Sequence, residues 1–251
     1  MDLQETLPIP VSAIIVAGGK GVRMGASVRK QFLSLGDRPV ICHTLNAFDQ
    51  CSDIDAIYLV APPDDIENCL EKWCPSITFH KRVQIVPGGR ERQDSVYQGI
   101  LAVSNQRSGI VVIHDGVRPF ITPQLISTCA QEARRSGACI VGIPVQDTVK
   151  QVRSHTIQKT LDRNVLWTAQ TPQAFEITRI RTAHENARKD GVVGTDDAML
   201  IERMGWPVRI IEGSRLNIKI TTPEDLALAE AIWQSIPSAV STGQITDCGG
   251  C

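Results

Sequence analysis

Short runs of consecutive apolar residues recur along the chain. Five of them stand out, at residues 13–17, 56–61, 83–86, 109–114 and 138–143. An unbroken apolar run, unlike strict apolar–polar alternation, is typical of a strand that is buried on both faces of a parallel sheet. The runs therefore predict five core strands, and a further strand is predicted at residues 208–212.

Helical patterns separate these strands, at residues 39–49, 64–73, 92–103 and 123–136, and a last helix is predicted from Pro223 to Trp233. Thr122 and Thr222 each precede a proline and match a helix N-cap followed by proline in the first turn. Strands that alternate with helices predict an α/β domain, with a mostly parallel, twisted sheet and helices on both faces. We expect a single domain over residues 1–237 and a disordered, Ser/Thr/Gly-rich tail at 238–251.

The pattern changes after Pro144, where two polar, alternating segments flank a short turn at residues 153–155. Alternation on both sides of a turn predicts a β-hairpin. Because the hairpin is polar on both faces, its own domain gains little by burying it. We predict an arm at about residues 147–163 that protrudes and packs elsewhere, and an ordinary surface hairpin is the alternative from the pattern alone.

The overall composition argues against several classes of protein. Apolar residues make up 42% and charged residues 21% of the 251 positions, as is ordinary for a water-soluble protein. The net charge of −1, from 26 basic and 27 acidic residues, argues against a duplex nucleic-acid binder, which normally carries a basic excess. No apolar run approaches the roughly 18 residues of a membrane span, and the first residues resemble neither a secretory nor a transit signal. We expect a cytoplasmic protein without nucleic-acid or membrane partners.

Eight cysteines are scattered along the chain. Cys42, Cys129 and Cys139 lie in apolar stretches and are expected to be small buried hydrophobic residues. Cys248 and Cys251 have CxxC spacing on the polar tail, where we expect free thiols, and a metal or redox role is the alternative.

A glycine-rich segment, AGGKGVRMG at residues 17–25, directly follows the first predicted strand. Glycines let a backbone approach a phosphate, and their N–H groups can surround an anion. A P-loop would end in Gly-Lys-Ser/Thr, which is absent. A dinucleotide fold would place an acidic residue about 20 positions later, whereas Asp64 comes some 45 positions after Gly19. The cations Arg23 and Lys30 favour a triphosphate instead, and a tight turn without ligand is the alternative.

Seven further blocks follow in order, at residues 88–96, 114–120, 147–150, 161–163, 170–175, 195–198 and 217–221. Together with AGGKGVRMG and the KQFLSLGDRPV that comes after it, they resemble the 2-C-methyl-D-erythritol 4-phosphate cytidylyltransferase family over roughly residues 12–233. The resemblance implies a Rossmann-like nucleotidyltransferase fold and transfer of CMP from CTP to 2-C-methyl-D-erythritol 4-phosphate. It also implies a homodimer joined through the hairpin arm. Triphosphate chemistry, rather than a ligand cluster, implies a divalent cation, expected to be Mg²⁺, that the CTP phosphates hold, with no protein metal site.

The nearest alternative is the ribitol 5-phosphate cytidylyltransferase family. It shares the glycine-rich segment, the Asp-x-x-Arg-Pro block and the Gln-Thr-Pro-Gln block. The stretches at 160–167 and 195–198 resemble the methylerythritol family more closely, so we favour that acceptor. A non-catalytic nucleotide-binding protein on this fold should have lost Arg23, Lys30 or Lys219, and all three are present.

The chemistry explains which residue types such a site needs. A phosphate monoester with a second pKa of about 6 is largely a dianion at neutral pH, so it can attack the α-phosphorus of CTP without a protein base. The remaining requirement is to stabilise charge on the α-phosphoryl and leaving groups. The resemblance assigns this task to four catalytic residues, with Arg23 and Lys30 at the transition state and Arg163 and Lys219 at the acceptor phosphate.

Two further sets of residues are implied by the same resemblance. The residues expected to bind the nucleotide are Ala17, Gly18, Gly19, Gly21, Gly88, Gly89 and Ser95. The residues expected to bind the acceptor are Asp115, Arg118, Thr148 and Thr171, with Thr148 placed on the arm. His114 is expected to be a structural histidine at a strand end. For Asp196 and Asp197 two readings stay open, the orientation of a site cation and the capping of a helix.

Overall fold

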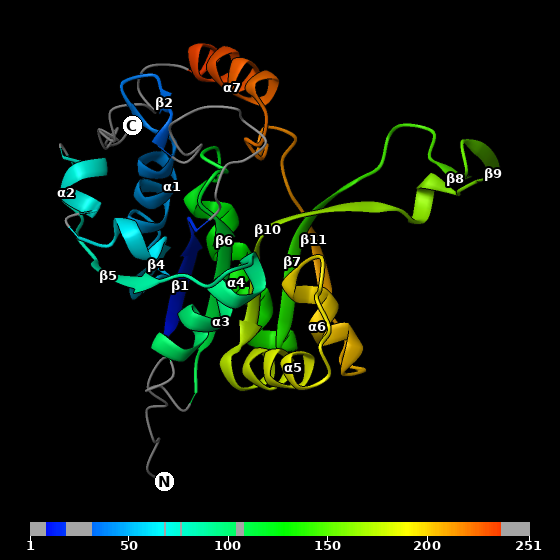
Figure 1. The fold of residues 1–251 in the computed structure, drawn as a ribbon, viewed down its shortest axis with the longest axis horizontal. Helices are drawn as coiled ribbons and strands as arrows, with labels where there is room; N and C mark the ends of the chain where they lie inside the picture. The colour runs from blue at the N-terminus through cyan, green and yellow to red at the C-terminus, as the bar shows by residue number, and fades with distance from the viewer. Residues whose placement is uncertain (1–8, 19–31, 68, 76, 104–107, 237–251) are drawn as a thin grey trace, which may run out of the picture.

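A computed structural model describes residues 9–18, 32–67, 69–75, 77–103 and 108–236. Its centre is a seven-stranded sheet with the strand order β11–β7–β10–β6–β1–β4–β5 (Figure 1). The strands are β1 (Val11–Val16), β4 (Ala56–Ala61), β5 (Arg82–Pro87), β6 (Ile110–Asp115), β7 (Ala138–Pro144), β10 (Trp167–Glu176) and β11 (Arg209–Glu212). β10 runs antiparallel to both of its neighbours, and the other pairs are parallel. The prediction of a mostly parallel α/β sheet is confirmed.

Helices cover both faces of this sheet. They are α1 (Val40–Asp49), α2 (Cys69–Trp73), α3 (Arg92–Val103), α4 (Pro123–Ser136), α5 (Ile177–Lys189), α6 (Asp197–Arg203) and α7 (Pro223–Ser235). Apolar side chains of α1, α2 and α4 form one core cluster with the sheet, and those of α3, α5 and α6 form a second. In β1, Ala13 and Ile15 belong to the first cluster and Ile14 to the second, because successive strand residues point to opposite faces.

The predicted strands correspond to β1, β4, β5, β6, β7 and β11. The helix predicted at residues 64–73 is wrong in length, since Pro62 and Pro63 begin a 3-10 turn at Pro63–Asp65 and only the short α2 follows. β10, α5 and α6 had no predicted counterpart. The division into one domain and a tail stays a prediction, and residues 238–251 lie outside the described residues.

Helix α7 packs in a third apolar cluster with Leu35, Val40, Val117 and Ile220. Its N-cap is as predicted: Thr222 Oγ1 accepts a hydrogen bond from the Asp225 amide at 3.3 Å, and the Asp225 carboxylate accepts one from the Thr222 amide at 2.9 Å. The predicted cap at Thr122 is also present on α4. Trp233 packs over the hairpin of β2 (Ser34–Leu35) and β3 (Arg38–Pro39) so closely that a side chain at Gly36 would collide with its indole.

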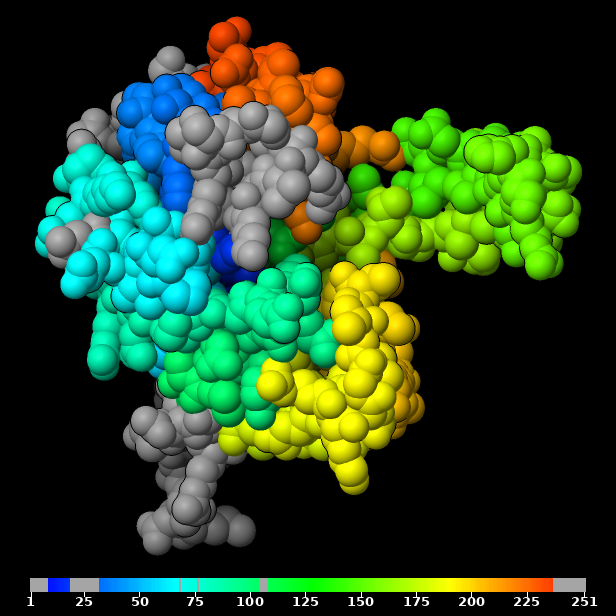
Figure 2. Space-filling model, in the orientation of Figure 1, coloured from blue at the N-terminus to red at the C-terminus, as the bar shows by residue number. Residues whose placement is uncertain are grey.

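The predicted hairpin is present as β8 (Lys150–Arg153) and β9 (Thr156–Thr160), and every residue of both strands is exposed. Ser154 and His155 form its turn with φ of 46° and 59°, the positive values that a type I′ hairpin turn requires at both central residues. The arm projects well away from the body (Figures 1 and 2). The hairpin is therefore confirmed, whereas its packing against another surface stays a prediction.

The prediction for Cys42 is wrong in part. Cys42 is buried, but it forms a disulfide with Cys74, which follows α2. The two residues are 32 positions apart, and only the packing of α2 against α1 brings them together. Cys129 and Cys139 are buried free thiols, as expected. Within the ranges that the structure describes, no helix has the length and apolarity needed to cross a membrane.

Candidate functional site

The predicted nucleotide-binding stretches meet at the carboxyl end of the sheet. Gly18 follows β1 and Gly88 follows β5, with β4 between the two strands. A Cβ atom on either glycine would lie 3.1 Å from Ser95 Oγ, so both backbones pass closely against this hydroxyl. Ser95 Oγ also accepts a hydrogen bond from the Gly89 amide at 3.1 Å. Gly18, Gly88, Gly89 and Ser95 are therefore brought together, with Ala17 buried next to Gly18.

Asp115, the last residue of β6, lies at the centre of the charged groups. Its Oδ1 accepts a hydrogen bond from Arg92 Nε at 2.9 Å, and its Oδ2 lies 2.6 Å from Lys219 Nζ and 3.9 Å from Arg118 Nε. Burial alone would raise the pKa of Asp115, but the charges of Arg92 and Lys219 hold it well below its usual range. Asp115 is thus a buried carboxylate that three cations share, and two of these were predicted to bind the acceptor.

Arg92 is a site residue that the sequence pattern did not single out. Besides Asp115, its guanidinium reaches Asp197, with 2.9 Å between Arg92 Nη1 and Asp197 Oδ2. Burial would lower the pKa of Arg92, but the two carboxylates outweigh burial and raise it. The sequence feature that could have identified Arg92 as a site residue is its position, at the start of a predicted helix and three residues before Ser95.

Of the two readings kept open for these aspartates, helix capping holds for Asp196 and the orientation of a site cation holds for Asp197. Asp196 caps α6, because its Oδ1 accepts a hydrogen bond from the Met199 amide at 3.0 Å. Asp197 is 1% exposed and orients Arg92 instead, while its other oxygen lies 3.2 Å from His184 Nε2. One aspartate therefore stabilises a helix end, and its neighbour holds a site cation.

Two further hydrogen bonds tie neighbouring segments to the surroundings of Asp115. The Asp115 amide donates a hydrogen bond to Thr171 Oγ1 at 3.1 Å, and Arg118 Nη1 donates one to the main-chain oxygen of Asn217 at 2.7 Å. Asn217 precedes Lys219 by two residues. The structure thus brings together four of the residues predicted to handle the acceptor, namely Asp115, Arg118, Thr171 and Lys219.

Other predicted site residues lie elsewhere. Arg163 is in a 3-10 turn (Arg163–Val165) at the base of the arm, where its Nη1 donates a hydrogen bond to Gln146 O at 2.6 Å. Thr148 is exposed on the arm. Among the contacts of the described residues, neither side chain bonds to Asp115 or Lys219 of its own chain. The predictions for Gly19, Gly21, Arg23 and Lys30 fall outside the described residues.

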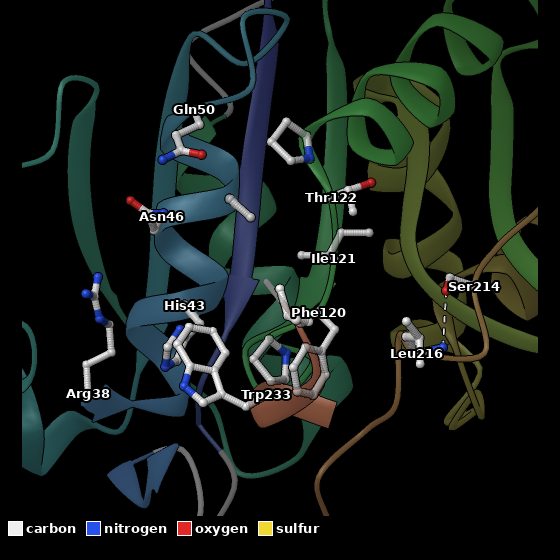
Figure 3. A pocket seen from close by; sticks show the side chains of 14 residues that line it. Arg38, His43, Asn46, Gln50, Phe120, Ile121, Thr122, Ser214, Leu216 and Trp233 are labelled. Atoms are coloured by element: carbon white, nitrogen blue, oxygen red, sulfur yellow. Dashed lines mark hydrogen bonds between the residues drawn. The ribbon is translucent and has the colours of Figure 1, made fainter. Parts of the chain in front are cut away.

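A separate pocket of about 240 Å³ lies between α1 and the residues that precede α4 (Figure 3). The rings of Trp233 and His43, whose centroids are 4.5 Å apart, meet edge to face at one end of it. Of the predicted site residues that the structure describes, none lines this pocket. It is therefore distinct from the site around Asp115.

His114 should make the free energy of unfolding depend on pH. Its ring is fully buried against Phe48, and burial lowers the pKa of His114 to about 3. An unfolded chain would protonate it near 6.5, so between these values the unfolded state binds more protons and stability falls as pH falls. We expect His114→Gln to remove about 1.4 kcal/mol per pH unit from the slope between pH 6 and 4.5. Denaturant titrations across this range would measure it, and an unchanged slope would contradict it.

The chain matches the family model described as IspD: 2-C-methyl-D-erythritol 4-phosphate cytidylyltransferase over residues 11–235. It is 50% identical to the 2-C-methyl-D-erythritol 4-phosphate cytidylyltransferase of Syntrophotalea carbinolica, over 88% of this chain and 95% of that protein. The protein of the same name from Geobacter metallireducens is 46% identical, over 88% of this chain and 96% of its own length.

Solved structures agree with this match. The crystal structure of the 4-diphosphocytidyl-2C-methyl-D-erythritol synthase from Anaerococcus prevotii is similar at a TM-score of 0.79 and 33% identity, and the alignment covers 90% of this chain and 96% of that one. The 2-C-methyl-D-erythritol 4-phosphate cytidylyltransferase from Thermus thermophilus is similar at a TM-score of 0.73 and 32% identity, over 90% and 100% of the two chains.

Proposed function

The chain belongs to the 2-C-methyl-D-erythritol 4-phosphate cytidylyltransferase family, and from this premise we propose what each site residue does when CMP passes from CTP to 2-C-methyl-D-erythritol 4-phosphate. The enzyme is a cytidylyltransferase of isoprenoid biosynthesis. The reaction gives 4-diphosphocytidyl-2-C-methyl-D-erythritol and pyrophosphate. The ribitol 5-phosphate alternative is not favoured, because these relatives carry the methylerythritol name.

One observation carries the residue assignments: Lys219 and Arg118 converge on Asp115 at the same end of the sheet as Gly18, Gly88 and Ser95. In an α/β sheet, ligands bind at the carboxyl ends of the strands. Gly88, Gly89 and Ser95 would recognise the cytosine of CTP through main-chain groups and one hydroxyl, and Gly18 would let the main chain approach the phosphates. Asp115, Arg118 and Thr171 would hold the acceptor, next to the α-phosphate.

Lys219 has a specific task in this scheme. In the free protein its ammonium is paired with Asp115, which keeps it at the site and neutralises it. When the acceptor binds, its dianionic phosphate would compete with Asp115 for Lys219, and Arg163 would add a planar, bidentate contact. The acceptor phosphate oxygen then forms a bond to the α-phosphorus while the bond from that phosphorus to the bridging oxygen breaks, and pyrophosphate leaves. Arg23 and Lys30 would stabilise the charge that develops there.

A divalent cation, proposed as Mg²⁺, fits the residues at this site. Mg²⁺ prefers oxygen ligands and commonly takes one or two carboxylates together with substrate phosphates. Asp115 is a carboxylate at this end of the sheet, but in the free protein Arg92 and Lys219 hold its two oxygens. Among residues 9–236, as far as they are described, no group of three or more His, Cys, Asp or Glu side chains could hold a metal by itself. The CTP phosphates would then supply most of the ligands, and the ion would neutralise part of their charge.

We propose that the arm joins two chains into a homodimer. Both strands of the arm are exposed along their whole length, and the apolar side chains of Val152 and Ile157 are 54% and 60% exposed. Arg163 and Thr148 lie on this arm, and in the described part of the chain neither contacts Asp115 of its own subunit. In a C₂ dimer each arm could reach the other subunit, so both residues would complete the partner's acceptor site.

The experiment that tests the proposed acceptor compares pyrophosphate release from CTP and Mg²⁺ with two acceptors. We expect kcat/KM for 2-C-methyl-D-erythritol 4-phosphate to exceed that for ribitol 5-phosphate by at least about 100-fold, because missing or misplaced polar contacts in a site built for hydroxyls are costly. An equal or reversed ratio would overturn the assignment of the acceptor.

A further inference from the structure

The segment that carries Lys219 has little regular structure of its own. Residues 213–220 form neither helix nor strand. Main-chain hydrogen bonds tie it to the body at Gly213, whose amide donates to Gly142 O at 2.7 Å, and at Ile220, whose amide donates to Val117 O at 2.9 Å. Between these two points, the position of the Lys219 ammonium depends on side-chain contacts.

Asn217 provides such contacts from the middle of this segment. Its side chain is fully buried, and its amide nitrogen lies 2.8 Å from Thr171 O and 3.3 Å from Gln170 Oε1. A side-chain amide has two N–H groups, so both are used. Gln170 is itself held, because its Nε2 donates to Ser214 O at 2.9 Å.

The main-chain oxygen of Thr171 is available to Asn217 because β10 is irregular at this point. Its pairing with β7 shifts register between Ala169 and Gln173, and its pairing with β6 begins only at Gln173. The main-chain oxygen of Thr171 is therefore outside both ladders, and a buried carbonyl needs a partner. Asn217 supplies that partner from a segment 46 residues away.

These contacts connect Asp115, Thr171 and the segment 217–219 in a closed ring around the site. The Asp115 amide donates to Thr171 Oγ1, Thr171 O accepts from Asn217, Asn217 precedes Lys219 by two residues, and Lys219 returns to the Asp115 carboxylate. The opposite side of the segment borders the pocket in Figure 3, where the Leu216 amide donates to Ser214 Oγ at 3.1 Å. The main-chain oxygen of Ser214 accepts two hydrogen bonds, from the Asn217 main-chain amide at 3.1 Å and from Gln170 Nε2.

We propose that Asn217 is a positioning residue for the reaction: its buried amide joins the irregular part of β10 to the segment of Lys219 and thereby fixes the Lys219 ammonium at the acceptor site. The proposal rests on the role of Lys219 in the proposed function. It requires an amide at this position, because a carboxylate of the same shape has no N–H group and would turn an oxygen toward Thr171 O and Gln170 Oε1.

The test is a double-mutant cycle with Lys219, measured as kcat/KM for 2-C-methyl-D-erythritol 4-phosphate at saturating CTP. We expect Asn217→Ala and Asn217→Asp each to lower kcat/KM at least about tenfold, with KM for CTP changed less than about threefold. In a Lys219→Ala background, Asn217→Ala should cost less than about threefold, since residues that act through one another are not additive. The isosteric Asn217→Asp tests the N–H donors should the alanine variant fold poorly.

Ile180→Ala is the matched control. Ile180 is fully buried on α5 and outside the site, so the variant should lose stability while keeping kcat/KM near wild type. An equal cost of Asn217→Ala with and without Lys219 would overturn the proposal and leave the role of Lys219 intact. Full activity of Lys219→Ala alone would overturn that role, and this proposal with it. Wild-type activity of Asn217→Asp would also overturn the proposal that Asn217 positions Lys219.

Discussion

Replacement of Lys30 by alanine is expected to lower kcat about 10²- to 10³-fold while KM for CTP changes only a few-fold. The reason is that its proposed contact forms with charge that develops in the transition state, and the loss of one such donor costs roughly 3–4 kcal/mol. Arg23→Ala should behave in the same way. Steady-state kinetics of pyrophosphate release, with CTP and acceptor varied separately, would measure both parameters.

Lys189→Ala is the control for this experiment. Lys189 is an exposed cation at the end of α5, and its removal should leave kcat and KM unchanged. If Lys30→Ala raised only KM for CTP, Lys30 would bind substrate and transition state equally well. The proposed role in the transition state would then be wrong.

Mixing two nearly inactive variants, Arg163→Ala and Lys30→Ala, is expected to restore activity to about a quarter of wild type. If Arg163 serves the partner's site, a heterodimer contains one site with both defects and one site with neither. Random pairing makes about half of the dimers heterodimers, and half of their sites are intact. Refolding or co-expression of the two chains, followed by the pyrophosphate assay, would measure the recovery.

The matched control pairs Lys30→Ala with Lys219→Ala. Both residues are proposed to serve the site of their own chain, so every site in every dimer carries a defect and the mixture should stay inactive. If Arg163→Ala with Lys30→Ala also stays inactive although heterodimers form, Arg163 acts within its own subunit. The shared acceptor site would then have to be abandoned.

Several features of the fold follow from local sequence. The apolar runs predicted β1, β4, β5, β6 and β7, because strands buried on both faces must be apolar along their whole length. The caps at Thr122 and Thr222 were predictable because an N-cap depends on residues three or four positions away. The grouping of Gly18, Gly88 and Ser95 was expected from a resemblance, and its physical basis is that both glycines follow the carboxyl ends of strands in the same sheet.

β10 shows why a central strand could not be predicted. Its buried part contains Gln170, Thr171 and Gln173 around Pro172, a composition that favours a turn or a surface. The strand is stable because distant groups satisfy its polar atoms: Asn217 bonds to Gln170 and Thr171, and Asp196 accepts a hydrogen bond from Gln173 at 2.8 Å. Because these partners are distant along the chain, the residues next to β10 in the sequence do not reveal them.

Neighbours along the chain were enough to predict the apolar core strands, most of the helices between them, the two caps and the residue types available for phosphate chemistry, but not β10, α5 or α6. Three contacts became visible only once the chain was folded: Arg92 joins Asp115 to Asp197, Cys42 pairs with Cys74, and Lys219 pairs with Asp115. Each of these contacts joins residues from 23 to 105 positions apart. The physical reason is that a charge or a thiol finds its partner by position in space, and that position is set by the packing of the whole sheet and its helices.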